Sequence, residues 1–184
     1  MKKILSCATL VLALALAVWG GTARSAEDKY SLKVPNGLAF SEFKGYEGWQ
    51  IINLSKSDRA FAVTLGNPAM IQAYADGYPA NGKPFPDGVR MAKIHWVPKK
   101  QDQFPDTAVA GTQHDVDFMV KDTRRFADSE GWGWAAFIYE PASGSFRIAN
   151  TSDKPPQAND AKCGLACHTI VKSKDYVFTE YASR

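Results

Sequence analysis

The 184-residue sequence has little cysteine, little net charge and no long apolar run beyond its first residues. A formal net charge of +3 excludes the strongly basic character typical of proteins that bind nucleic acid or anionic membranes. There is no internal repeat and no low-complexity tract, which excludes solenoid and other repeat architectures. What remains is an ordinary globular chain, preceded by one special segment.

That segment, residues 1–26, has the order of a secretory signal peptide. Two lysines precede an apolar run over residues 4–19, and small residues follow the run up to Ala26. The core of this run is too short for a membrane-spanning helix, and small residues suited to cleavage follow it at once. We therefore expect export, removal of the signal, and no membrane span in the remaining chain.

The remaining residues, 27–184, are enough for one domain with a real core and too few to expect two. Loss of the signal removes three basic residues and no acidic one, so the net charge falls near zero. It also removes Cys7, which leaves Cys163 and Cys167 as the only thiols. These two cysteines are therefore the candidates for a disulfide or for any attachment through a thiol within the domain.

Alternation and turn chemistry predict an α+β fold, mainly an antiparallel sheet with a few short helices. Asn67 and Pro68 suit the start of a short helix that Gly77 ends, and Asp122 caps a further helical turn. We expect a loop at His114 and a linker over residues 152–159. Strands are expected at Gln50–Leu54, Ala60–Leu65, Val89–Val97, Asp115–Val120 and Glu130–Glu140.

Two of these strands carry polar residues in a pattern that stands out. The period of two places Lys93 and His95 on the same face as Met91, in an otherwise apolar row. In the next strand Asp115 and Asp117 share one face. The ordinary interpretation of each is a solvated or locally hydrogen-bonded strand residue.

The strongest local motif lies near the C-terminus, where residues 163–168 read Cys-Gly-Leu-Ala-Cys-His. Two thiols a turn apart can add to the two vinyl groups of one haem, and a histidine directly after the second can bind the iron. The usual spacing is C-x-x-C-H, so this chain has one residue more. Gly164 can relax the backbone across the longer spacer.

Two other interpretations of this motif remain open. A disulfide between Cys163 and Cys167 is the ordinary expectation in an oxidising compartment. A small metal site would use both thiols and His168, with His95 or His114 as a fourth ligand.

From about Trp49 to Tyr181 the sequence resembles the cytochrome P-460 family, through four stretches in family-like order. The stretches are Pro86-Asp87-Gly88 followed by Lys93, Val120-Lys121-Asp122-Thr123-Arg124-Arg125-Phe126-Ala127, Trp134-Ala135-Ala136-Phe137-Ile138-Tyr139, and Cys167-His168 with Asp175-Tyr176-Val177-Phe178-Thr179. Members are small periplasmic c-type cytochromes of mostly β structure that usually form homodimers. The resemblance thus implies a periplasmic, homodimeric domain over residues 27–184.

The same resemblance implies roles for particular residues. Haem c would be attached through Cys163 and Cys167, with His168 as the iron ligand. In hydroxylamine-oxidising members a strand lysine is also joined to the porphyrin ring, and Lys93 holds the matching position. An acidic residue near the distal pocket matches Asp117, which could accept protons from the substrate.

Three functions follow from the resemblance. The first is oxidation of hydroxylamine, with electrons passed to an acceptor protein. The second is binding of nitric oxide or carbon monoxide without turnover, as in the related cytochromes c′-beta. The third is simple electron transfer, which would need His95 or Met91 as a sixth iron ligand. Two departures bear on the choice: the cysteine spacer is longer than usual, and His95 replaces an apolar residue.

Overall fold

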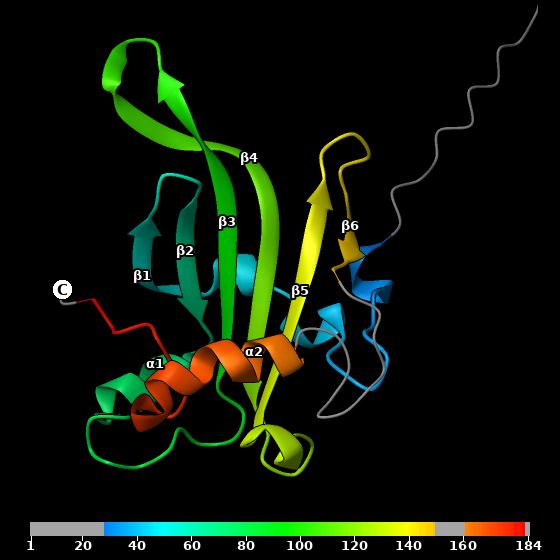
Figure 1. Ribbon diagram of the computed structural model, residues 1–184, viewed down its shortest axis with the longest axis vertical. Coiled ribbons are helices and arrows are strands. Elements are labelled where there is room, and N and C mark those ends of the chain that lie inside the picture. Colours follow the sequence, from blue (N-terminus) through cyan, green and yellow to red (C-terminus); the bar gives the residue numbers. More distant parts are fainter. Residues whose placement is uncertain (1–27, 150–160, 183–184) are drawn as a thin grey trace, which may run out of the picture.

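The protein is built on one six-stranded antiparallel sheet, in which the strands follow one another in sequence order from β1 to β6 (Figure 1). The computed structural model describes residues 28–149 and 161–182. The expected signal peptide and the expected linker at 152–159 lie outside the described residues. The strands are β1 Gln50–Lys56, β2 Phe61–Gly66, β3 Arg90–Gln101, β4 Phe104–Lys121, β5 Trp132–Glu140 and β6 Ser145–Ile148.

The helices are short and lie on both faces of the sheet. Two are α-helices, α1 Pro68–Ala75 and α2 Ala161–His168. The 3₁₀ helices are Lys29–Ser31, Phe40–Phe43, Tyr46–Gly48, Ala127–Ser129 and Thr169–Lys174. Together with the sheet they make an α+β fold, which confirms the predicted class. Within the described part of the chain, no helix is long and apolar enough to cross a membrane.

Local sequence explains where α1 begins. The side chain of Asn67 accepts a hydrogen bond from the Met70 backbone N–H at 2.9 Å, and Pro68 occupies the first turn. The helix buries Met70 and Ala73 against the sheet. The predicted start and end of this helix are confirmed.

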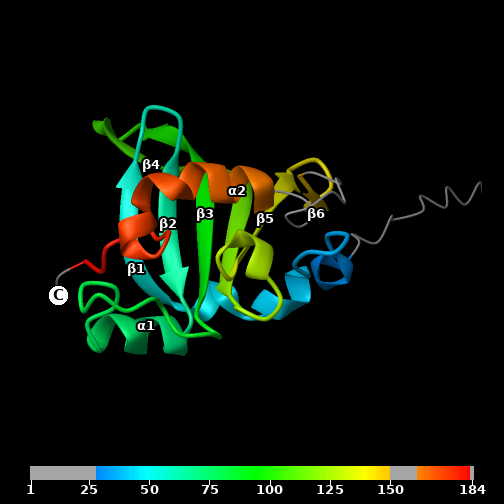
Figure 2. The same cartoon turned by 60° about the horizontal axis from the view of Figure 1, so that its bottom comes forward.

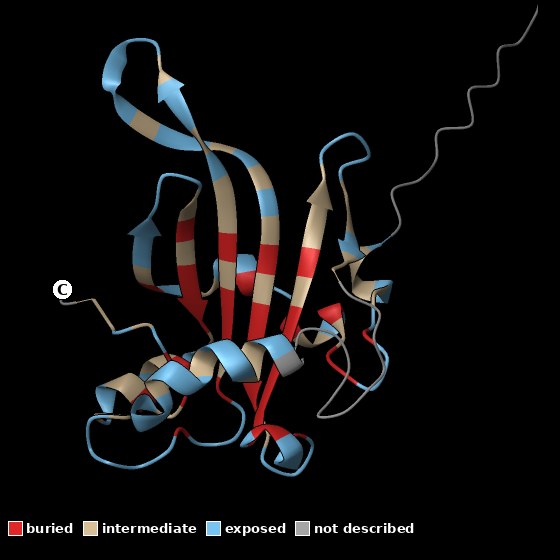
Figure 3. Ribbon diagram, in the orientation of Figure 1, coloured by how far each residue is buried: buried red, intermediate tan, exposed pale blue. Residues whose placement is uncertain are grey.

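The hairpin of β3 and β4 is longer than the sequence pattern predicts. It extends beyond the neighbouring strands (Figure 1), and the far part of it is largely exposed (Figure 3). An exposed strand carries little apolar alternation, so residues 104–114 gave no strand signal. The expectation of a loop at His114 is wrong, because this residue lies within β4.

The two faces of the sheet bury different clusters. One face packs Ala92, Ile94, Phe118 and Phe137 against aromatic residues of the N-terminal 3₁₀ helices. The other face packs its apolar residues against α1, α2 and the C-terminal segment; its members include Met91, Met119, Trp132, Trp134, Tyr176 and Val177. This second face carries the candidate site.

Candidate functional site

A cavity of about 170 Å³ lies between the sheet and the C-terminal segment. Helix α2 crosses one face of the sheet, as Figures 1 and 2 both show, and its last residue lines the cavity. Three predicted site residues, Lys93, Asp117 and His168, line the same cavity. Its other lining residues are Thr64, Met91, Phe118, Met119, Trp134, Val177, Phe178 and Thr179. A second, more open cavity of about 300 Å³ shares Thr64, Lys93, Phe178 and Thr179 with the first.

His168, the last residue of α2, is oriented by its surroundings. Its Nδ1 donates a hydrogen bond to the backbone carbonyl of Tyr176 at 2.6 Å. Its ring packs against those of Trp134 and Phe178, at centroid distances of 5.4 Å and 4.9 Å. Because Nδ1 carries the proton, Nε2 keeps its lone pair for a metal ion.

The electrostatics of the cavity keep His168 in the form that binds metals. Burial lowers the pKa of His168, the hydrogen bond to Tyr176 partly opposes this, and the nearby charge of Lys93 lowers it further. A neutral imidazole is the form in which histidine coordinates iron.

A buried ion pair holds the carbonyl that orients His168. The Asp175 carboxylate accepts hydrogen bonds from Lys121 Nζ at 2.9 and 3.2 Å, from the Phe85 backbone N–H at 2.7 Å, and from the Trp132 indole at 3.3 Å. The side chain of Lys121 is only 4% exposed. Asp175 and Tyr176 both have positive φ, +48° and +64°, which other residues than glycine rarely adopt. The pair therefore stabilises a strained turn next to the iron-ligand candidate.

Helix α2 approaches the sheet closely at Gly164. A Cβ atom built there would lie 2.4 Å from the ring of Trp134, closer than side chains pack. The sequence suggested that Gly164 relaxes a long cysteine spacer, but the structure gives a different reason for glycine. It lets the helix that carries Cys163, Cys167 and His168 lie directly on β5.

Cys163 and Cys167 are free and exposed, four residues apart in α2 and therefore on one side of the helix. The structure does not pair them as a disulfide. Nor does it bring His95 or His114 to them as a fourth metal ligand, since both histidines contact Asp115. The two alternatives to haem attachment find no support in this geometry.

Lys93 and Asp117 face each other across β3 and β4. They are partners in the strand register, and Thr64 of β2 is the partner of Lys93 on the other side. The Asp117 side chain is 46% exposed in the structure, with the cavity on one side of it. The predicted common face of Met91 and Lys93 is confirmed by their shared position in the cavity wall.

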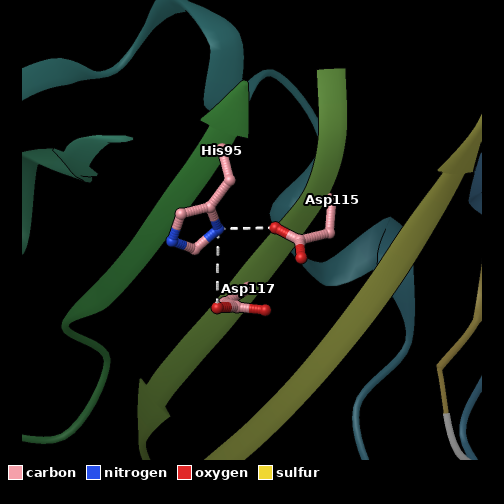
Figure 4. Close-up of side chains that lie close together, drawn as sticks. All are labelled: His95, Asp115 and Asp117. Carbon is pink, nitrogen blue, oxygen red and sulfur yellow. Dashed lines mark hydrogen bonds and ion pairs between the residues drawn. The ribbon is translucent and has the colours of Figure 1, made fainter. Parts of the chain in front are cut away.

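His95 is not among the residues that line the cavity with His168. Its Nδ1 lies 2.5 Å from Asp115 Oδ1 and 3.8 Å from Asp117 Oδ2 (Figure 4). This leaves Met91, which lines the cavity, as the remaining candidate for that role.

Comparison with known families decides the identity of the chain. The family described as Cytochrome P460 matches residues 43–179. The chain belongs to the cytochrome P460 family. A comparison with curated proteins finds no match. The predicted resemblance is confirmed, and the protein is a cytochrome whose cofactor is haem iron.

The site of this cytochrome P460 fits that cofactor. His168 offers a neutral, oriented Nε2, and the cavity wall is rich in apolar and aromatic side chains. The indole Nε1 of Trp134 is buried and has no hydrogen-bond partner among the described residues. Such an orphaned donor in the cavity wall suits a polar group of a bound cofactor. His168 would hold the iron, and the rings of Trp134 and Phe178 would pack against its imidazole ring.

Sequence reasoning missed several residues of the cytochrome P460 site. Trp134 and Phe178 belong to the family-like stretches, but nothing in the sequence pattern gives either residue a role at the site. Lys121 and Asp175 lie 54 positions apart, and no periodic pattern links them. Their only signal was that both fall within the stretches that carry the resemblance.

Proposed function

We propose that this cytochrome P460 is an exported, periplasmic c-type cytochrome that oxidises hydroxylamine. The observation that carries the proposal is the single cavity in which His168 meets Lys93 and Asp117. When bound, the haem supplies the redox chemistry and an open coordination position for a small nitrogen compound. An acceptor protein takes the electrons, and the domain works as a homodimer like its relatives.

Covalent attachment rests on Cys163 and Cys167. Both thiols are free, exposed and on one side of α2, next to the cavity that His168 enters. Each adds to one vinyl group, which fixes the cofactor to the same helix as its iron ligand.

Lys93 and Asp117 divide the remaining chemistry. The Lys93 amine, on a central strand, would be bonded to the edge of the ring and tune its electronic properties; that bond replaces one N–H and one ring C–H, whose hydrogens go to an external two-electron oxidant such as a peroxide. The Asp117 carboxylate accepts the protons that hydroxylamine loses as it is oxidised, which is general-base catalysis. The strand register keeps these two side chains opposite each other.

A second candidate function is reversible binding of nitric oxide or carbon monoxide. The apolar part of the wall favours it, since Met91, Met119 and Val177 offer a small uncharged ligand a dry environment. In that case Lys93 stays free and Asp117 takes no part.

The deciding experiment is a denaturing-gel haem stain and intact mass of the exported protein, followed by its ferrous spectrum. For the proposed function we expect covalent haem and a strongly red-shifted Soret band in wild type, and an ordinary c-type band in Lys93→Ala. Lys99→Ala, on the exposed part of the same strand, is the matched control and keeps the wild-type band.

Asp117→Asn then tests the proton acceptor. We expect hydroxylamine oxidation to fall about 10²-fold or more, as for other general bases, with the ferrous spectrum unchanged. An ordinary spectrum in wild type, with tight nitric oxide binding and no turnover, would favour the gas-binding function. Absence of covalent haem would reject both.

A further inference from the structure

Next to the cavity lies a compact cluster of possible metal ligands that the haem site does not use in full. His95, Asp115 and Asp117 each offer one ligand atom, and these atoms all lie within 4.8 Å of one another. Figure 4 shows Nδ1 of His95 directed toward both carboxylates. Two distances from this nitrogen define the group, 2.5 Å to Asp115 Oδ1 and 3.8 Å to Asp117 Oδ2.

The sheet holds these three residues on rigid backbone. His95 and Asp115 are partners in the register of β3 and β4, and Asp117 lies two residues along on the same face. The neighbouring strands place Ala62 beside His95, and Ile138 and Ala136 beside the two aspartates. These side chains have no hydrogen-bonding atoms, so they do not compete for the ligand atoms of the cluster.

A second histidine extends the ligand set. Nδ1 of His114 lies 2.7 Å from Asp115 Oδ2, so the Asp115 carboxylate has an imidazole at each oxygen. His114 is thus a further imidazole beside the same carboxylate.

We propose that His95, Asp115 and Asp117 form a second metal site, separate from the haem iron, for a divalent first-row transition ion such as Zn²⁺. Imidazole nitrogen with carboxylate oxygen is a common ligand set of such ions, whereas Ca²⁺ and Mg²⁺ prefer oxygen alone. Water or His114 completes the coordination.

The present distances need only small changes to accept the ion. With bonds of about 2.0–2.2 Å, two ligand atoms on a tetrahedral ion lie about 3.4 Å apart. His95 and Asp117 are close to that separation, and His95 and Asp115 must part by roughly 1 Å once the proton between them leaves. Partial exposure, 19% for His95 and for Asp115, leaves the ion a path from solvent.

One nearby charge works against the site. Lys93 lies opposite Asp117, and as a free ammonium it repels a cation; bonded to the haem as proposed above, it no longer carries that charge. The two carboxylates of the cluster outnumber that one amine, so the net local charge is negative and attracts a divalent cation.

A metal ion at this site would affect the proposed oxidation of hydroxylamine, and only this part of the inference rests on that proposed function. An ion bound by Asp117 occupies the carboxylate that would accept protons from hydroxylamine. Zn²⁺ is then an inhibitor that leaves haem attachment untouched.

The test is a direct titration of the tag-free, haem-loaded protein with Zn²⁺ by calorimetry, with Co²⁺ absorption as a second readout. The sequence has three histidines, and His168 faces the haem cavity, so binding is read on the other two. We expect one site in wild type and at least tenfold weaker binding in each of His95→Ala, Asp115→Asn and Asp117→Asn. Asp106→Asn, in the exposed part of β4, is the control that keeps wild-type affinity.

These binding measurements test the second metal site independently of whether the protein oxidises hydroxylamine. An unaltered haem spectrum in every variant shows that the fold persists. Wild-type binding that is absent at millimolar Zn²⁺, or that any of the three variants leaves unchanged, would overturn the site and reduce the cluster to a hydrogen-bonded histidine–aspartate group. If Zn²⁺ binds but wild type never oxidises hydroxylamine, the metal site stands and the proposed function fails.

Discussion

Strands β3 and β4 have different roles on the two faces of the central sheet. Even-numbered residues of β3 and β4, such as Ala92 and Phe118, join an aromatic cluster with rings from the N-terminal 3₁₀ helices. Odd-numbered residues of the same strands, such as Lys93 and Asp117, line a cavity or bind one another. The comparison teaches that packing which stabilises the fold and groups that carry chemistry are separated by one residue of register.

The largest expected effect lies on the aromatic face. Phe40 is fully buried, and its ring contacts five others, at distances that include 4.8 Å to Phe137 and 5.1 Å to Phe118. Phe40→Ala should lower the free energy of unfolding by about 4 kcal/mol, because it removes this packing and leaves a cavity. Denaturant unfolding measures the loss. The haem spectrum of the folded variant should stay as in wild type, and a changed spectrum would mean that the two faces are not independent.

The next effect lies on the opposite face, at the ion pair of Lys121 and Asp175. Asp175→Asn leaves the buried ammonium of Lys121 without its counter-charge, which should cost about 3 kcal/mol of stability. It should also loosen the Tyr176 carbonyl that orients His168. We therefore expect a shift of the iron–histidine stretching band in the resonance Raman spectrum of the ferrous protein.

This pair of variants separates a structural role from a positioning role. Phe40→Ala and Asp175→Asn destabilise the protein to a similar degree, yet only the second should move the iron–histidine band. Asp175→Glu, which keeps the charge, should recover part of the stability. If Asp175→Asn leaves the band in place, the ion pair serves the fold alone.

The sequence could predict which residues of these strands lie on which face of the sheet. Alternation along residues 89–97 and 115–120 separates the two faces correctly, and the motif at Cys167 and His168 points to the helix end that meets the cavity. Contacts between distant segments could not be predicted, since nothing local links Lys121 to Asp175 or Gly164 to Trp134. The exposed half of β4 was missed because solvent on both sides removes the apolar signal.

A smaller effect should follow from closing the space at Gly164. Gly164→Ala places a methyl group 2.4 Å from the present position of the Trp134 ring, so either the ring or α2 must move. We expect a loss of about 2 kcal/mol from overpacking, together with reduced haem attachment, because the helix that carries both cysteines is displaced. Unfolding and haem staining per unit of protein measure the two effects. Ala166→Gly, at an exposed position of the same helix, controls for helix propensity, and Gly164→Ala should reduce haem attachment more than this control does.

The smallest effect concerns an ion pair at the edge of the aromatic face. Arg125 donates to both carboxylate oxygens of Glu42, at 2.6 and 2.9 Å, and the Ala39 N–H donates at 2.8 Å. Burial raises the pKa of Glu42, but these hydrogen bonds and the charge of Arg125 outweigh it, so the folded-state pKa lies below the ordinary value. A group with a depressed folded-state pKa stabilises the protein at pH values above its unfolded-state pKa, and this stabilisation is lost as the pH falls through the folded-state pKa.

Glu42→Gln should therefore cost about 1 kcal/mol of stability at pH 7, a modest figure because Arg125 is partly exposed. The difference from wild type should shrink as the pH falls from the ordinary glutamate value through the lower folded-state pKa, because Glu42 is then protonated in both states. Urea unfolding of both proteins from pH 7 to pH 3 measures it, and a difference that grows on acidification would contradict the assignment.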